Sequence, residues 1–120
     1  MKIIFLTGNK DKLAEAKLII PEVEGREIDL PEIQEIDPKK IIENKLMEAA
    51  RHLEDNLIVE DTSLYFLGLN GLPGPLIKWF MKTIDNDGLV KMAKIFGNDA
   101  EARTWIGYLE NGKIEFFEGV

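Results

Sequence analysis

The sequence predicts an α/β protein with a mixed β-sheet flanked by helices, in a single domain over residues 1–120. Short apolar runs typical of buried strands alternate with segments whose apolar residues recur at helical spacing. The last part of the chain instead shows two extended segments joined by a turn. Strand–helix units followed by an antiparallel hairpin are the pattern of a mixed sheet covered by helices.

The first strand–helix unit lies at the start of the chain. Residues 3–6 form a continuous apolar run that predicts a buried strand, and residues 11–20 predict a helix stopped by Pro21. One face of that helix carries Leu13, Ala16 and Ile20. Residues 27–30 predict a second strand.

A second helix has clear boundary signals. Asp37 is expected to cap it, and Pro38 suits its first position. It is expected to continue to about residue 52 or 53, with an apolar face formed by Ile42, Leu46, Ala49, Ala50 and Leu53.

The second half of the chain begins with a buried strand at residues 57–59, continuing extended through residue 67. Residues 68–75 predict a structured loop, and a short helix is expected from Pro75 to Met81. Asp85 or Asp87 is expected to cap a further helix that ends at Gly97. Its expected inward positions are Leu89, Val90, Ala93 and Phe96.

A β-hairpin is predicted next. Residues 102–109 and 113–118 alternate as strands, and Asn111-Gly112 between them is typical of a type I′ turn.

Composition excludes several classes of function. The formal net charge of −7 disfavours polymeric nucleic acid as a partner, while a mononucleotide needs only a local basic patch. The chain has no cysteine, so thiolate chemistry and disulfides are excluded. No apolar run approaches the length of a membrane span, and we expect a cytoplasmic location and no membrane partner. The single histidine, His52, lies late on a helix and does not indicate a serine triad.

The first strand-to-helix turn has the features of an anion site. The free N–H groups and positive dipole at a helix N-terminus attract anions, Gly8 permits close approach, and Lys10 and Lys12 add charge. The turn lacks the Gly-Lys-Ser/Thr ending of a P-loop. A capped helix with solvated lysines would show the same residues.

Two other features, a pair of adjacent carboxylates and a lysine beside an apolar helix face, indicate a ligand-binding site. Glu60 and Asp61 are expected at the carboxyl end of a buried strand, where ligands bind in open α/β sheets. Since neighbouring strand residues point to opposite faces, the two carboxylates should have different roles. A strand that simply reaches solvent is the alternative. Lys45 lies at the flank of the apolar face of its helix, where its ammonium group can extend into a cleft.

Four segments together resemble the inosine/xanthosine triphosphate pyrophosphatase family, in its archaeal and eukaryotic branch. They are Thr7-Gly8-Asn9 with Lys12, residues 29–32 (Asp-Leu-Pro-Glu), residues 60–62 (Glu-Asp-Thr), and residues 71–80 (Gly-Leu-Pro-Gly-Pro-Leu-Ile-Lys-Trp-Phe). The resemblance implies hydrolysis of non-canonical purine triphosphates (inosine, deoxyinosine and xanthosine triphosphates) to the monophosphate and pyrophosphate, with Mg²⁺ as cofactor, in nucleotide-pool sanitation.

The resemblance also implies roles for individual residues. The turn residues Thr7, Gly8 and Asn9, together with Lys12 and Lys45, would bind the phosphates. Glu32 would hold Mg²⁺, with Glu60 nearby. Asp61 would hold the metal or orient and deprotonate the attacking water.

Family members extend past the point that resembles Val120, and the resemblance implies that the chain corresponds to the N-terminal two-thirds of their fold. Their Gly-Phe-Gly-Trp/Tyr-Asp-Pro and Ser-His-Arg segments, which grip the base, do not occur in residues 1–120. We therefore expect a homodimer or association with the missing C-terminal part. A truncated relative that binds nucleotide or phosphate without turnover is the alternative.

Overall fold

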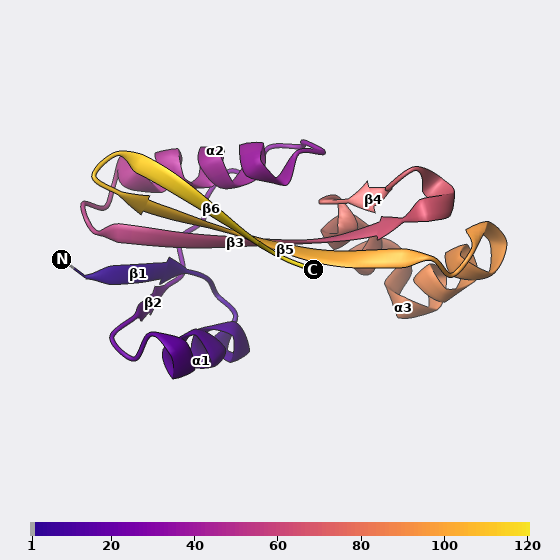
Figure 1. Cartoon of the computed structure of the whole chain (residues 1–120), viewed down its shortest axis with the longest axis horizontal. Coiled ribbons are helices and arrows are strands. Elements are labelled where there is room, and N and C mark those ends of the chain that lie inside the picture. Colours follow the sequence, from indigo (N-terminus) through magenta and orange to yellow (C-terminus); the bar gives the residue numbers. More distant parts are fainter. Residues whose placement is uncertain (1) are drawn as a thin grey trace.

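The strands of the computed structural model, which describes residues 2–120, form one mixed sheet with helices packed against it (Figure 1). The molecule is elongated, with principal extents of 49 × 26 × 23 Å. In chain order the elements are β1 (Ile3–Leu6), α1 (Lys10–Ile19), β2 (Glu24–Arg26), α2 (Pro38–Ala50), β3 (Asn56–Phe66), the 3-10 turn η1 (Leu67–Leu69), β4 (Pro73–Gly74), α3 (Ile77–Phe96), β5 (Ala100–Glu110) and β6 (Lys113–Gly119).

The sheet has the order β2-β1-β3-β5-β6, with β4 paired to β3. β1 runs parallel to β2 and β3. β3 is antiparallel to β4 and β5, and β5 is antiparallel to β6. β1 pairs with β3 only as far as Ile58, and β4 pairs with the same edge at Leu64 and Tyr65. In the described chain, residues 59–63 of β3 therefore have no strand neighbour on that edge.

The core lies between α2 and one face of the sheet. Alternate residues of β3, beginning with Leu57 and Val59, point toward α2 and are buried with residues of β1 and β5. Gly107 on β5 lets α2 approach closely, because a Cβ atom there would lie 2.2 Å from Cγ2 of Ile42. The cluster of buried residues consists of Ile4, Ile42, Leu46, Ala49, Leu57, Val59 and Leu109.

Several sequence predictions are confirmed. Asp37 caps α2 through a hydrogen bond from the Lys39 N–H at 3.0 Å, and Pro38 is the first helical residue. The hairpin turn has positive φ at both Asn111 and Gly112 (49° and 77°), as a type I′ turn requires. Gly97 ends α3 as expected.

Other element boundaries were predicted wrongly. The second strand is β2, and residues 27–30 lie outside the sheet, because the pairing with β1 ends at Arg26. α2 ends at Ala50 rather than at residue 52 or 53, and Ala50 itself is exposed. The helix expected from Pro75 begins at Ile77.

The two helices expected after the loop form α3, which is interrupted at Asp85 (φ 54°, ψ −169°). Two of its predicted inward residues, Val90 and Phe96, are exposed. The reason is the position of α3 at the far end of the sheet, beside β4, where the described chain offers only part of β3 to pack against (Figure 1). Among the described residues, no helix is both long enough and apolar enough to cross a membrane.

Candidate functional site

A polar cavity of about 340 Å³ lies at the carboxyl end of β1, beside the stretch of β3 that has no strand neighbour. The β1–α1 turn, the segment before α2, α2 itself, β3 and the start of α3 all contribute to it. Its lining includes Thr7, Gly8, Glu27, Glu32, Lys45, Glu60 and Lys78. Five of the predicted site residues line the cavity: Thr7, Gly8, Glu32, Lys45 and Glu60. Asn9, Lys12 and Asp61 do not line it, but Lys12 is paired with Glu60, and Asp61 lies close enough to Lys45 for that charge to affect its pKa.

The β1–α1 turn is organised around Asn9. The side chain of Asn9 caps α1 by accepting the Asp11 and Lys12 N–H groups at 2.9 and 3.1 Å. The Thr7 hydroxyl in turn accepts the Asn9 N–H at 3.1 Å. Two N–H groups expected to bind phosphate are thus already occupied, so Asn9 acts here as a helix cap, while Thr7 and Gly8 face the cavity.

Lys12 connects α1 to β3. Its Nζ lies 2.5 Å from Glu60 Oε1, and the Thr62 hydroxyl also donates to that oxygen at 3.1 Å. The chain was expected to continue extended through residue 67, and β3 does continue to Phe66. Glu60 therefore lies within the strand rather than at its carboxyl end, because pairing with β5 and β4 extends β3 beyond the end of β1.

Glu32 binds two lysines from different helices. Its Oε1 lies 3.2 Å from Lys45 Nζ, and its Oε2 lies 3.2 Å from Lys78 Nζ. Burial alone would raise the pKa of Glu32, but the two ammonium groups lower it overall. Lys78 was not among the predicted site residues. Its place directly after a proline-rich loop was the available signal, but only the fold brings it to Glu32.

Asp61 is the most buried acid of the site. It is 7% exposed and accepts a hydrogen bond at 3.2 Å from the hydroxyl of fully buried Ser63. Burial raises its pKa from 3.8 to about 6, and the charge of Lys45 opposes this shift. The predicted opposite orientation of the two carboxylates is confirmed, since Asp61 points to the α2 face and Glu60 pairs with Lys12 from α1, while their separate roles stay a prediction.

The carboxylates do not form a closed metal site. Within residues 2–120, no three acidic or histidine side chains gather closely enough to enclose an ion. Burial chiefly raises the pKa of Asp61, and the charges of Glu32 and Glu60 add to the rise, so the three carboxylates act on one another. Such oxygen ligands suit Mg²⁺, which usually takes one or two carboxylates and completes its shell with water and substrate oxygens.

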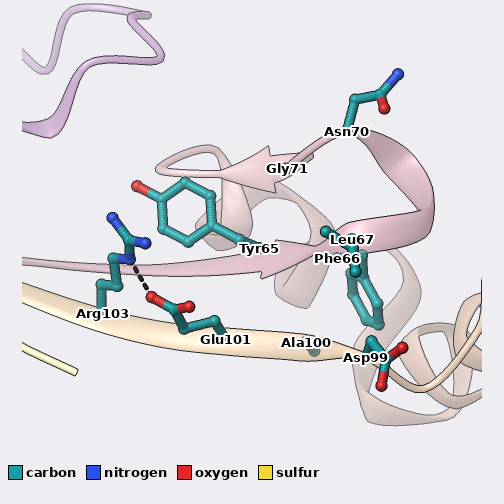
Figure 2. Close-up of a pocket in the computed structure, with 9 residues that line it drawn as sticks. All are labelled: Tyr65, Phe66, Leu67, Asn70, Gly71, Asp99, Ala100, Glu101 and Arg103. Atoms are coloured by element: carbon teal, nitrogen blue, oxygen red, sulfur yellow. Dashed lines mark hydrogen bonds and ion pairs between the residues drawn. The ribbon is translucent and has the colours of Figure 1, made fainter.

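A second cavity, of about 440 Å³, lies at the far end of β3 and β5 (Figure 2). Among the described residues that line this cavity, Arg103 is the one with a positively charged side chain. Its guanidinium carbon lies 5.4 Å from the centre of the Tyr65 ring, and the group pairs with Glu101 and Glu118. Asp99 also lines the cavity. Because acidic residues outnumber Arg103 and already pair with its guanidinium group, this cavity does not suit a phosphate, and the first cavity is the candidate site.

Comparison with known protein sequences gives relatives that match nearly the whole chain. The chain is 41% identical over 124 residues to the inosine triphosphate pyrophosphatase of Schizosaccharomyces pombe, covering 98% of this chain and 65% of that protein. It is 37% identical over 131 residues to that of Candida glabrata, covering 99% and 68%. The chain thus spans about two thirds of the length of these relatives.

Solved structures share the fold. The Staphylococcus aureus Ham1 protein matches with a TM-score of 0.80 at 21% identity, covering 99% of this chain and 69% of that one. The nucleoside-triphosphatase, or dITP/XTP pyrophosphatase, of Mycobacterium abscessus matches with a TM-score of 0.74 at 22% identity, covering 99% and 71%.

The fold and the cavity define an α/β protein with lysines and carboxylates interleaved at the end of a parallel strand pair. A model of the Ham1 family matches residues 3–120. The chain belongs to the Ham1 family.

Proposed function

We propose that this chain provides the phosphate- and metal-binding part of an enzyme that hydrolyses non-canonical purine nucleoside triphosphates to the monophosphate and pyrophosphate. The observation that carries the proposal is the cavity in which Lys45 and Lys78 meet Glu32, with Lys12 and Asp61 nearby. The names of the relatives, inosine triphosphate pyrophosphatase and dITP/XTP pyrophosphatase, support this substrate class.

The residues of the cavity suit hydrolysis of a polyphosphate, which requires charge neutralisation and a positioned water more than covalent chemistry. The ammonium groups of Lys12, Lys45 and Lys78 would neutralise phosphate oxygens. Thr7 and Gly8 line the wall beside them and would bind the same chain of phosphates.

Asp61 is the candidate to orient the attacking water and accept its proton. With a pKa of about 6 its carboxylate is mostly ionised at pH 7, yet more basic than an exposed aspartate. Ser63 holds one oxygen of Asp61 and leaves the other for water.

Mg²⁺ is the cofactor that the donor set favours, because hard carboxylate oxygens line the cavity. Glu32 would hold it, with Asp61 or Glu60 as a second ligand. When bound, the ion would supply charge stabilisation for the phosphoryl oxygens and the leaving pyrophosphate.

The proposed partner surface lies on the other face of the sheet. An apolar cavity of about 470 Å³ between α1, β3, β5 and β6 includes Ile58, Ile106, Tyr108 and Phe117. We propose that either a second copy of the chain or a polypeptide corresponding to the remaining third of a Ham1 protein covers it, because apolar surface of this extent seldom stays in water.

The test is pyrophosphate release from inosine, xanthosine, adenosine and guanosine triphosphates with Mg²⁺. We expect the 120-residue chain to be slow and unselective, since base selection needs polar groups that go unpaired with the wrong base. Adding a polypeptide that carries the rest of the relatives' length should raise both rate and selectivity. In that complex, Asp61→Asn should lower kcat roughly a hundredfold with little change in KM.

An exposed aspartate provides the matched control, and Asp87→Asn should leave the rate unchanged. Fast, selective hydrolysis by the 120-residue chain alone would contradict the proposal that this chain supplies only the phosphate- and metal-binding part of the enzyme. Binding of Mg²⁺ and inosine triphosphate without pyrophosphate release, even in the complex, would favour the alternative of a binding protein.

A further inference from the structure

The lysines of the cavity that could bind phosphate are paired with carboxylates. Lys45 and Lys78 each lie 3.2 Å from a different oxygen of Glu32. Lys12 lies 2.5 Å from Glu60. A phosphate chain that enters this cavity therefore competes with a carboxylate for each ammonium group.

Glu32 and Glu60 hold their lysines differently. Glu60 is mostly buried and also accepts the Thr62 hydroxyl, so it has a reason to stay in place. Glu32 lies on an irregular segment before α2, and its hydrogen-bond and ion-pair partners within residues 2–120 are the two lysines. Glu32 is thus the carboxylate that can leave its lysines when another cation takes their place.

We propose that Glu32 makes this site select the divalent-metal complex of an oligophosphate over the free anion, an inference that rests on the proposed function. With no metal bound, Glu32 occupies Lys45 and Lys78 and repels incoming phosphate. When Glu32 ligates a divalent cation, the same movement frees both ammonium groups for the phosphate oxygens of that complex. Metal and oligophosphate therefore bind cooperatively through one side chain.

The strength of the ion pairs fits such an exchange. The side chains of Lys45, Glu32 and Lys78 are 19%, 35% and 51% exposed, so the two pairs are partly screened by water. Each such pair is weak, and together they correspond to roughly a tenfold change in an equilibrium constant. The lysines lower the pKa of Glu32 although burial opposes them, so the carboxylate stays charged at neutral pH.

The experiment is calorimetric binding of inorganic tripolyphosphate to the 120-residue chain, in EDTA and in excess MgCl₂. For the unmodified chain we expect at least roughly tenfold tighter binding with Mg²⁺. Glu32→Gln should bind tripolyphosphate roughly tenfold tighter than the unmodified chain in EDTA, and Mg²⁺ should no longer strengthen its binding. A double variant, Glu32→Gln with Lys78→Gln, should lose most of the gain in EDTA.

Glu22→Gln is the charge control. Glu22 is exposed in the turn after α1 and does not line the cavity, and the substitution removes the same charge. It should change metal-free binding by less than about twofold. A tripolyphosphate affinity in EDTA that is unchanged or weaker in Glu32→Gln overturns the proposal, as does an equal gain in Glu22→Gln. Absence of tripolyphosphate binding by every variant, with and without Mg²⁺, overturns the proposed function as well.

Discussion

The two faces of β3 differ in how completely they are covered. On the α2 face, Leu57 and Val59 are almost fully buried, and the burial extends to Asp61 and Ser63. On the α1 face, Ile58 and Glu60 border an apolar cavity of about 470 Å³ that is open to solvent. Successive residues of β3 thus point alternately into the buried core and toward a surface that water can reach.

This difference in burial determines which face of β3 contributes most to stability and which carboxylate has a raised pKa. Since burial of apolar area is the main stabilising term in folding, the α2 face should carry most of the free energy of unfolding. The same dry environment gives Asp61 its raised pKa, whereas Glu60 on the other face pairs with Lys12. Four pairs of substitutions test this contrast.

The largest effect is expected in the core. Leu46→Ala removes a fully buried side chain on the sheet-facing side of α2 and should lower the free energy of unfolding by about 2–5 kcal/mol. Leu18→Ala on α1, where the side chain is 85% exposed, should change it by less than about 0.5 kcal/mol. Urea denaturation followed by circular dichroism measures both. Similar losses in the two variants would show that the α1 face is also packed in solution.

The next effect concerns Asp61 and pH. Its pKa of about 6 in the fold lies above its ordinary value of 3.8, so folding favours the protonated acid. Its contribution to stability is therefore full below about pH 4 and is lost as the pH rises to about 6. In metal-free buffer at pH 7.5, Asp61→Asn should raise the free energy of unfolding by up to about 3 kcal/mol.

The gain from Asp61→Asn should disappear below pH 4, where the native side chain is neutral too. Asp87→Asn, at an exposed position, serves as the control for removal of one charge. A gain that is the same at pH 4 and pH 7.5 would show that ionisation of Asp61 does not limit stability.

Local signals predicted the parts of the fold that local interactions determine. Asp37-Pro38 and Asn111-Gly112 fixed a helix start and a hairpin turn because their backbone preferences act within a few residues. The end of the second strand could not be predicted, because it depends on where β1 stops. Val90 was misplaced for a similar reason, since helical spacing identifies an apolar face but not whether another element covers it.

The site also combines residues that the sequence predicted with contacts that only the fold creates. Glu32, Lys45 and Asp61 were predicted from the resemblance and gather as expected, but the partner of Lys45 was not predicted. The bridge from Glu32 to Lys78 joins residues 46 positions apart, and no spacing in the sequence indicates it. Asn9 was assigned to phosphate, and its capping bonds became visible only in the structure.

A smaller effect is expected at that cap. No residue of α1 is buried, so the helix depends on local interactions more than α2 does. Asn9→Ala removes both capping bonds and should cost about 1 kcal/mol, while Asn9→Asp should retain most of the stability. Hydrogen exchange should show lost protection in α1 and unchanged protection in α2. Equal loss in both helices would mean that α1 and the core unfold as one unit.

The smallest effect, and the most direct comparison of the two faces, concerns the neighbours Phe116 and Phe117 on β6. Phe116 packs against the core on the α2 face, whereas Phe117 is 53% exposed beside the apolar cavity. Phe117→Ser should change the free energy of unfolding by less than about 0.5 kcal/mol, because little apolar area leaves water at that position on folding. Phe116→Ser, with the same chemical change one residue away, should cost about 1–3 kcal/mol.

The two variants should also separate in their association behaviour. Removing an exposed aromatic ring from an open apolar face weakens contacts between molecules, so Phe117→Ser should reduce self-association and dye binding measured by sedimentation velocity and fluorescence. Phe116→Ser should leave association unchanged or increase it, since it loosens the core. If Phe117→Ser instead costs as much stability as Phe116→Ser, Phe117 must be buried in solution, and the stability should then depend on protein concentration because a second copy covers it.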